Sequence, residues 1–252
     1  MRFGKCASRI STTPTINNIY FGTAILSQDS ANADWEAVLS SASRLQTLLP
    51  EAVLVGGTAS ALFAHHRFSF DHDHVVTDLK DRFDDVLTDL ESVAGWKTAR
   101  VRRPVLILGS LDGIETGVRQ LIRSRPLETT SIKIQGMGVT VPTFAEILRI
   151  KAFLALKRNA TRDYVDFAAL SDTLGTKGTV EACRNFDAYY PLDNGQSALQ
   201  QTIKQLASPV PYDLEQIDLS LFKGLDAQWH HFESVVQQCV AVSIALLHDA
   251  AA

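Results

Sequence analysis

A short, wholly apolar segment that runs into two consecutive glycines constrains this fold more than any other part of the sequence. Residues Ala52 to Val55 read Ala-Val-Leu-Val, which is typical of a strand that is buried on both faces. Gly56 and Gly57 end that strand, and the segment from Thr58 to about His65 predicts a helix rich in Ala, Leu and Phe. A buried strand that leads directly into a helix indicates a sheet covered by helices, which is a mixed α/β architecture.

The pattern changes near residue 142, from strands alternating with helices to helices alone. A helix from Asp34 to Leu49 is expected before the buried strand, and a helix from Asp78 to Val93 after a strand-like segment at Phe68 to Val76. Thr143 and Glu146 have the spacing of a helix capping box. We therefore expect a poorly patterned leader at residues 1–30, a mixed-sheet domain at 31–142 and a helical domain at 143–252. Further strands are expected at 97–101, 105–108, 114–121, 131–134 and 139–141, further helices at 144–157, 161–173, 178–189, 195–207 and 227–249, and a linker at 208–224.

The residues that follow the buried strand have the composition of a phosphate and metal site. Two glycines let the backbone approach a ligand closely, and the next helix offers unpaired N–H groups at its N-terminus, with the hydroxyl of Thr58 beside them. Asp71 and Asp73 lie two residues apart in a strand-like segment, so both carboxylates are expected on one face. Such a pair suits Mg²⁺ or Mn²⁺ that also binds substrate phosphates. The sequence thus predicts a divalent cation beside the bound phosphates of a substrate.

Two blocks of residues resemble a known family. The first is Gly56-Gly57 followed by Arg67-x-Ser69-x-Asp71-x-Asp73, and it looks like the signature of the AbiEii family of nucleotidyltransferase toxins, also called the MenT-like group. That family sits in the polymerase-beta-like nucleotidyltransferase superfamily. The second block is Lys151, then Arg158, then Arg162-Asp163-Tyr-Val-Asp166, and it resembles the family's helical motif. The resemblance covers roughly residues 50–172 and implies a nucleotidyltransferase-fold mixed sheet with flanking helices plus a helical C-terminal domain, an α/β (α+β) fold.

The resemblance also implies an activity and a role for each matching residue. The activity is transfer of a nucleoside monophosphate from a triphosphate to an acceptor, with tRNA or another RNA as the implied acceptor and a cognate antitoxin as the implied protein partner. Binding of the triphosphate falls to Gly56, Gly57 and Thr58, and binding of the metal to Asp71 and Asp73. Lys151 is implied to reach the triphosphate or the developing charge, Asp163 and Asp166 to position that lysine or the acceptor, and Arg67 and Ser69 to shape the loop before the metal pair.

The resemblance also implies a third metal-binding carboxylate on a later, neighbouring strand, as the superfamily normally has. Glu115, just after the turn at Asp112-Gly113, is the preferred candidate. Asp112 is ranked second, because turn residues are often Asp for backbone reasons alone. His74 stands where that family has an apolar residue, and His72 adds a second imidazole nearby. Imidazole suits Zn²⁺. In a strand, however, His72 and His74 face away from the aspartates, which favours packing histidines over a mixed metal cluster.

Charge and composition set limits on the acceptor and on the compartment. The formal net charge of −4 excludes a uniformly basic nucleic-acid-binding surface, but six arginines between residues 100 and 125 form a local basic run that could contact triphosphate or RNA. A small-molecule acceptor such as an aminoglycoside, or a non-catalytic binding or regulatory module of the same fold, are the rival readings. Three widely spaced cysteines form no disulfide framework or metal knuckle, and no apolar run is long enough to span a bilayer, so we expect a cytoplasmic protein without a membrane partner.

Overall fold

The computed structural model describes residues 28–250 and has a five-stranded mixed sheet as its centre. The strand order is β1-β2-β5-β4-β3, in which β2 and β5 run parallel and every other neighbouring pair is antiparallel. A separate hairpin, β6-β7, packs beside β1. The expected α/β fold is therefore confirmed. The strands are β1 Val53–Val55, β2 Asp71–Val76, β3 Trp96–Arg102, β4 Leu106–Leu111, β5 Ile114–Gln120, β6 Thr129–Ile134 and β7 Met137–Pro142.

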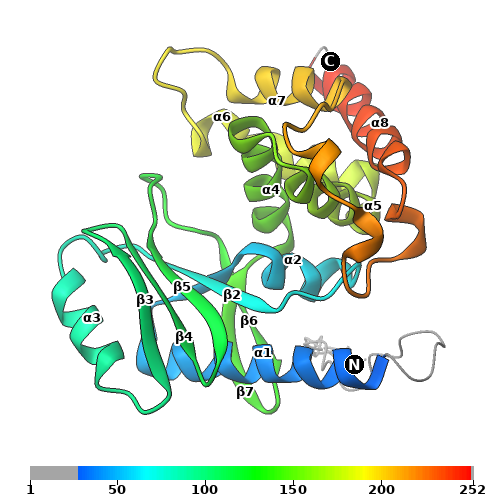
Figure 1. Ribbon diagram of the computed structural model, residues 1–252. Helices are drawn as coiled ribbons and strands as arrows, with labels where there is room; N and C mark the ends of the chain where they lie inside the picture. The colour runs from blue at the N-terminus through cyan, green and yellow to red at the C-terminus, as the bar shows by residue number, and fades with distance from the viewer. Residues whose placement is uncertain (1–27, 251–252) are drawn as a thin grey trace, which may run out of the picture.

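Helices cover the sheet on one side and form a separate layer on the other. In Figure 1, α1 runs along the lower side of the strands with α3 at one end, and the helices after β7 gather above them. The apolar residues of α1, α3, β4 and β5 form one core, and those of α4, α5, α7 and α8 form another. The helices are α1 Gln28–Leu48, α2 Gly56–Ala64, α3 Phe83–Glu91, α4 Phe144–Arg158, α5 Thr161–Cys183, α6 Phe186–Tyr189, α7 Ala198–Ala207 and α8 Phe232–Ala250, with 3-10 turns η1 Leu214–Gln216, η2 Leu219–Leu221 and η3 Ala227–Trp229.

Several helix boundaries differ from the sequence expectation; α7 begins at Ala198 and not at residue 195, and α8 begins at Phe232 and not at residue 227. The first helix begins at Gln28 and not at Asp34, so the last residues of the expected 1–30 leader belong to α1, while residues 1–27 lie outside the described part of the chain. The helix expected from Asp78 begins only at Phe83, because Arg82 pairs with Asp78 and Glu51 in a turn that precedes it. In contrast, the expected break after residue 173 is present, since Gly175 adopts φ 76° and divides α5.

The capping box expected at Thr143 is formed only in half. The Thr143 hydroxyl accepts a hydrogen bond of 3.2 Å from the backbone N–H of Glu146, as an N-cap residue does. The Glu146 carboxylate does not reach back. It is fully buried and pairs with Arg123 at 2.6 Å and with Arg149 at 2.7 Å. Glu146 thus joins the loop after β5 to α4, and it connects the sheet to the helical layer.

The expected linker at 208–224 is a folded segment that holds a loop of the sheet. We call residues 218–226 the clasp. The N–H of Phe68 donates to the carbonyl of Lys223 at 2.9 Å, and the N–H of Asp226 donates to the carbonyl of His66 at 2.8 Å. Gly224 has φ 64°, and a Cβ there would lie 2.4 Å from the Phe68 ring, so the approach requires glycine. The clasp fixes the loop that leads into β2, on which the predicted metal pair lies.

Candidate active site

The predicted metal pair lies on one face of β2, as the two-residue spacing requires. Asp71 is exposed and Asp73 half-buried, whereas His72 and His74 between and after them are buried on the opposite face. The ring of His72 contacts the hydroxyls of Ser41 and Thr116, each at 2.9 Å, and burial lowers its pKa to about 4. Burial also holds the pKa of His74 well below its ordinary value. The two histidines pack beneath the sheet as neutral residues, as expected.

The glycine turn lies beside this pair because β1 and β2 are antiparallel neighbours. Val55 is in register with Asp73, so Gly56 follows immediately next to the carboxylates. Gly56 has φ 76°, and a Cβ there would lie 3.6 Å from Oδ2 of Asp73. The α2 N-terminus has no side-chain cap. The first turn of α2 therefore lies beside the metal pair without a side-chain cap, and amides at such a helix start suit the oxygen atoms of a phosphate.

Thr58 is committed to the main chain in this arrangement. Its side chain is buried, and its hydroxyl donates to the backbone carbonyl of Asp71. This bond ties the start of α2 to the start of β2 and so fixes the position of the metal pair. The predicted contact of Thr58 with a phosphate stays a prediction, since its hydroxyl already has a protein partner.

Arg67 and Ser69 pack against the second glycine of the turn. A Cβ on Gly57 would lie 2.5 Å from Nη2 of Arg67 and 2.9 Å from the Ser69 hydroxyl, so both side chains occupy the space that glycine leaves. Ser69 donates a hydrogen bond of 2.8 Å to Oδ1 of Asp71. The two residues thus shape the loop before the metal pair, which agrees with the geometry that the resemblance implied for them.

The helical motif forms a buried charge cluster that meets Arg67. Lys151 contacts Asp166 at 2.7 Å and Asp163 at 3.2 Å, and Arg67 reaches Asp166 with Nε at 2.8 Å and with Nη2 at 3.2 Å. His66 adds a contact of 2.8 Å to the same carboxylate. All five side chains are at most 9% exposed. Two cations and two carboxylates balance one another, which is the condition for keeping charges in a protein interior.

The electrostatics of this cluster keep the charged forms in place. Burial alone would raise the pKa of Asp166, but Arg67 and Lys151 outweigh it and hold that pKa well below its usual range. Burial likewise opposes the ammonium of Lys151, yet Asp166 and Asp163 raise its pKa. For His66 burial outweighs Asp166, so the pKa is lowered and the ring is neutral. A neutral His66 donates from Nε2 to Asp166, and its buried Nδ1 has no hydrogen-bond partner among the described residues.

Lys151 is consequently placed to position other groups. Its ammonium is held by both carboxylates of its motif and is nearly inaccessible. The expected pairing of Asp163 and Asp166 with Lys151 is present in the structure. A direct contact of Lys151 with a triphosphate remains a prediction, because it would require the ammonium to leave both carboxylates. From the sequence His66 is only one of the histidines that crowd the site, with His65, His72 and His74, and its contact with Asp166 was not predicted.

The preferred third carboxylate, Glu115, is a register neighbour of the metal pair. Parallel pairing of β2 with β5 sets Glu115 opposite Asp71 and Gly117 opposite Asp73. Glu115, Asp71 and Asp73 all line a groove of about 480 Å³ over β2, β5, β4 and β3, together with Lys97 and Arg119. The alternative, Asp112, lies at the hairpin turn and pairs with Arg44. Asp112 therefore does not line the groove.

The donor set of this groove fits a hard divalent cation, although the side chains are not gathered around one point. Within residues 28–250 no three His, Cys, Asp or Glu side chains are grouped as metal ligands. Asp73 instead pairs with the Arg119 guanidinium at 3.3 Å. A Cβ on Gly117 would lie 2.5 Å from Oδ1 of Asp73, so glycine leaves the space in which that carboxylate sits. Carboxylate oxygens that line one groove suit Mg²⁺ or Mn²⁺.

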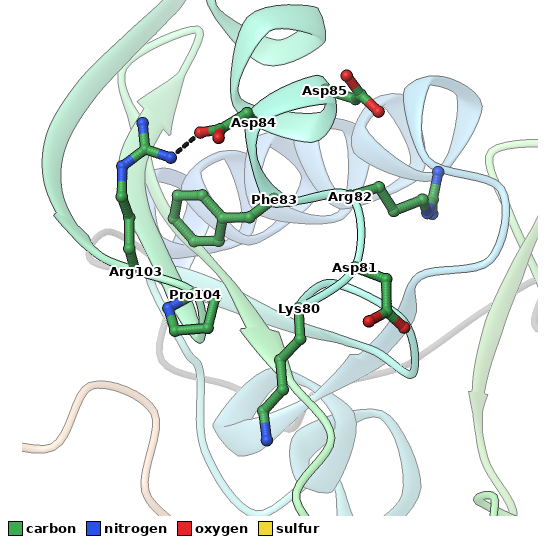
Figure 2. Close-up of a pocket in the computed structure, with 8 residues that line it drawn as sticks. All are labelled: Lys80, Asp81, Arg82, Phe83, Asp84, Asp85, Arg103 and Pro104. Carbon is green, nitrogen blue, oxygen red and sulfur yellow. Dashed lines mark ion pairs between the residues drawn. The ribbon is translucent and has the colours of Figure 1, made fainter.

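Part of the basic run shares one sheet face, because Arg102 is aligned through Leu106 with Arg119, which lies in the groove, and Arg100 is in register with Leu108 of the groove. The other arginines lie elsewhere. Arg123 leaves the strand and stacks against the rings of Tyr189 and Tyr190 at the helical layer. Arg103 lies beside a second hollow, where it pairs with Asp84 (Figure 2). That hollow, of about 340 Å³, shares no residue with the groove. It is lined by Lys80, Asp81, Arg82, Phe83, Asp84, Asp85, Arg103 and Pro104.

Comparison with solved structures agrees with this architecture. A candidate nucleotidyltransferase from H. pylori superposes on 88% of this chain and 97% of its own, with a TM-score of 0.52 and 16% identity. The chain has a nucleotidyltransferase-type fold. An antigenic nucleotidyltransferase-like protein from Paracoccidioides brasiliensis aligns with 67% of this chain and 93% of its own, with 19% identity and a TM-score of 0.43.

Comparison with curated sequences gives a different set of relatives. No family model matches the chain. The heme uptake protein MmpL11 of Mycobacterium tuberculosis is 35% identical over 131 residues, which is 51% of this chain and 13% of the relative. The mycolic acid-containing lipids exporter MmpL11 of Mycolicibacterium smegmatis is 27% identical over 223 residues, 87% of this chain and 22% of the relative. The chain thus spans a small part of these relatives. No helix between residues 28 and 250 is long and apolar enough to cross a membrane.

Proposed function

We propose that this protein is a metal-dependent nucleotidyltransferase. The observation that carries the proposal is the juxtaposition at one end of the groove. Asp71 and Asp73 face the groove from β2, Glu115 lies in register beside them, and the uncapped N-terminus of α2 opens towards the same point. A nucleotidyltransferase-type fold with carboxylates and free amides at that place has the parts for binding a metal and a triphosphate.

In the proposed reaction an acceptor hydroxyl or phosphate oxygen attacks the α-phosphorus of a nucleoside triphosphate. A bond forms between that oxygen and the nucleoside monophosphate, the bond to the β-phosphate breaks, and pyrophosphate leaves. Asp71, Asp73 and Glu115 would hold Mg²⁺ or Mn²⁺, which when bound activates the acceptor and stabilises the leaving pyrophosphate. The amides of Gly56 and Gly57 bind the triphosphate, and the buried cluster of Lys151 and Asp166 keeps Arg67 and the glycine turn in position.

The proposed acceptor is RNA, with tRNA as the form that the family resemblance favours, and the proposed role is the toxin of a toxin–antitoxin pair. Lys97 and Arg119 line the groove, and cations beside a transfer site suit a phosphate backbone. An aminoglycoside, being cationic, would instead be favoured by an acidic pocket in the helical domain. The proposed compartment is the cytoplasm, where nucleoside triphosphates and RNA occur together.

The test is transfer of label from each of the four α-³²P nucleoside triphosphates to total tRNA in the presence of Mg²⁺ or Mn²⁺. We expect one triphosphate to label the RNA, and we expect Asp71→Asn and Glu115→Gln to abolish the transfer. Asp112→Asn is the matched control, because it removes a carboxylate of the adjacent turn that lies outside the groove. Absence of transfer from all four triphosphates to tRNA and to an added aminoglycoside, or equal transfer by Asp71→Asn, would refute the enzymatic proposal.

The toxin role has its own test. Expression of the wild-type chain is expected to arrest growth, and expression of Asp71→Asn at the same level is not. Labelling of an added aminoglycoside in place of RNA would instead establish the small-molecule alternative. Growth arrest that persists on expression of Asp71→Asn would show that toxicity does not depend on the predicted metal site in the groove.

A further inference from the structure

Asp73 already has a cationic partner, and that partner comes from the neighbouring strand. The Nε atom of Arg119 lies 3.3 Å from Oδ1 of Asp73. Asp71 differs, since its Oδ1 accepts from the Ser69 hydroxyl and it makes no ion pair within residues 28–250. The two members of the predicted metal pair therefore stand in different electrostatic surroundings. One is open to a cation, and the other is neutralised by an arginine.

The position of Arg119 follows from the register of β5. Glu115, Gly117 and Arg119 alternate along the strand, so they share the face that looks into the groove. Gly117 is directly opposite Asp73 and carries no side chain that could separate the carboxylate from the guanidinium. Arg119 can thus reach back along its own strand to Asp73. Any larger residue at position 117 would meet the carboxylate first.

The ion pair is weak enough to be exchanged. The side chain of Arg119 is 41% exposed and that of Asp73 is 33% exposed, so water screens the attraction. A divalent cation carries twice the charge and is more compact than a guanidinium, and it can therefore displace Arg119 from the carboxylate. Once displaced, the guanidinium remains in the groove, because the strand that carries it does not need to move. There it can meet a second anionic ligand.

We propose that Arg119 is a positioning residue that exchanges partners on metal binding. In the metal-free protein it neutralises Asp73, and when a divalent cation takes that carboxylate, Arg119 turns to the phosphates of the triphosphate. The inference rests on the proposed function, and it adds a coupling between the two ligands. Because coupling is reciprocal, the cation strengthens triphosphate binding and the triphosphate strengthens cation binding, both through Arg119.

The test compares wild-type protein with Arg119→Gln and with Lys97→Gln. Lys97 lines the same groove and makes no ion pair in the described part of the chain, so its variant loses the same charge without freeing Asp73. Free Mn²⁺ is measured by electron paramagnetic resonance during a titration without nucleotide. Removal of an exposed ion pair predicts that Arg119→Gln binds Mn²⁺ about two- to fivefold more tightly than wild type. Lys97→Gln is expected to show a smaller change.

The second half of the exchange is measured with α,β-methylene triphosphates, which cannot undergo transfer. At saturating Mn²⁺, Arg119→Gln is expected to bind them more weakly than wild type, so the variant gains metal and loses triphosphate affinity. Equal Mn²⁺ affinity in Arg119→Gln and Lys97→Gln, or unchanged triphosphate binding in Arg119→Gln, would overturn the inference alone. No Mn²⁺ binding by wild type or either variant, with all three folded by thermal melting, would overturn the metal site of the proposed function as well.

Discussion

Neutralising Asp166 is the perturbation with the largest expected effect on stability. This carboxylate is fully buried and receives four contacts, from Lys151, from two nitrogen atoms of Arg67 and from His66, at 2.7 to 3.2 Å. Asp166→Asn keeps the volume but leaves two buried cations with the single charge of Asp163. The amide NH₂ group that replaces one carboxylate oxygen is a hydrogen-bond donor, and it would face the donor groups of Lys151, Arg67 and His66. Removing one partner of a buried ion pair costs about 3–5 kcal/mol, which is a large part of the roughly 5–15 kcal/mol that stabilises a domain.

The assay for this prediction is urea unfolding followed by circular dichroism. With a slope of about 2–3 kcal/mol/M, the expected loss lowers the midpoint by about 1–2 M. Asp172→Asn is the control. Asp172 is exposed on the same helix α5, and its side chain accepts one hydrogen bond within residues 28–250, from Gln228 at 3.4 Å, so the effect should stay within about 0.5 kcal/mol. A loss below about 1 kcal/mol in Asp166→Asn, or an equal loss in both variants, would show that the cluster does not act as argued.

Three further predictions follow from groups described above. Because the pKa of Asp166 is depressed in the folded state, its carboxylate stabilises the fold above the ordinary Asp pKa, and this stabilisation is lost as pH falls below it. The difference in free energy of unfolding between wild type and Asp166→Asn, measured by urea titration, should therefore become smaller below about pH 4. His74 is buried in its neutral form, so as pH falls through about 6.5 this histidine is protonated in the unfolded chain before it is protonated in the folded protein. The free energy of unfolding of wild type should therefore fall by about 2 kcal/mol more than that of His74→Leu between pH 7 and pH 5. Equal pH dependence of the two free energies would contradict this. The new Cβ of Gly117→Ala would meet the Asp73 carboxylate, so this variant should bind Mn²⁺ at least about tenfold more weakly. Its melting temperature should not fall as that of Asp166→Asn does. Unchanged Mn²⁺ affinity would place the metal elsewhere.

The parts of the site that could be predicted from sequence are those that local geometry decides. A two-residue period alone sets Asp71 and Asp73 on one face and His74 on the other, and the structure agrees. An apolar strand followed by two glycines predicts the sharp entry into α2. The N-cap at Thr143 is likewise local. In each case the neighbours that decide the outcome lie within a few residues along the chain.

The remaining features depend on residues that are distant in sequence. The Glu146 side chain has the spacing of a capping box. Its buried carboxylate instead pairs with Arg123 and Arg149, because hydrogen bonds from a charged guanidinium are stronger than one from a neutral backbone N–H. Thr58 has the position of a phosphate ligand, yet the carbonyl of Asp71 lies within reach of its hydroxyl once β2 pairs with β1. His66 acquires its partner only when α5 packs against the loop. Sequence spacing carries no information on these tertiary contacts.

The clasp gives the site a place in the order of synthesis. The loop that leads into β2 is made early, whereas the carbonyl of Lys223 that accepts from Phe68 is made about 150 residues later. A growing chain is built from its N-terminus, and its sheet can form before the clasp exists. The loop that contains His66 and Arg67 can form its backbone hydrogen bond with Asp226 only after that residue has been added to the chain. A ribosome stalled ahead of the clasp would carry β2, with the predicted metal pair, without the backbone contacts that fix the loop before it.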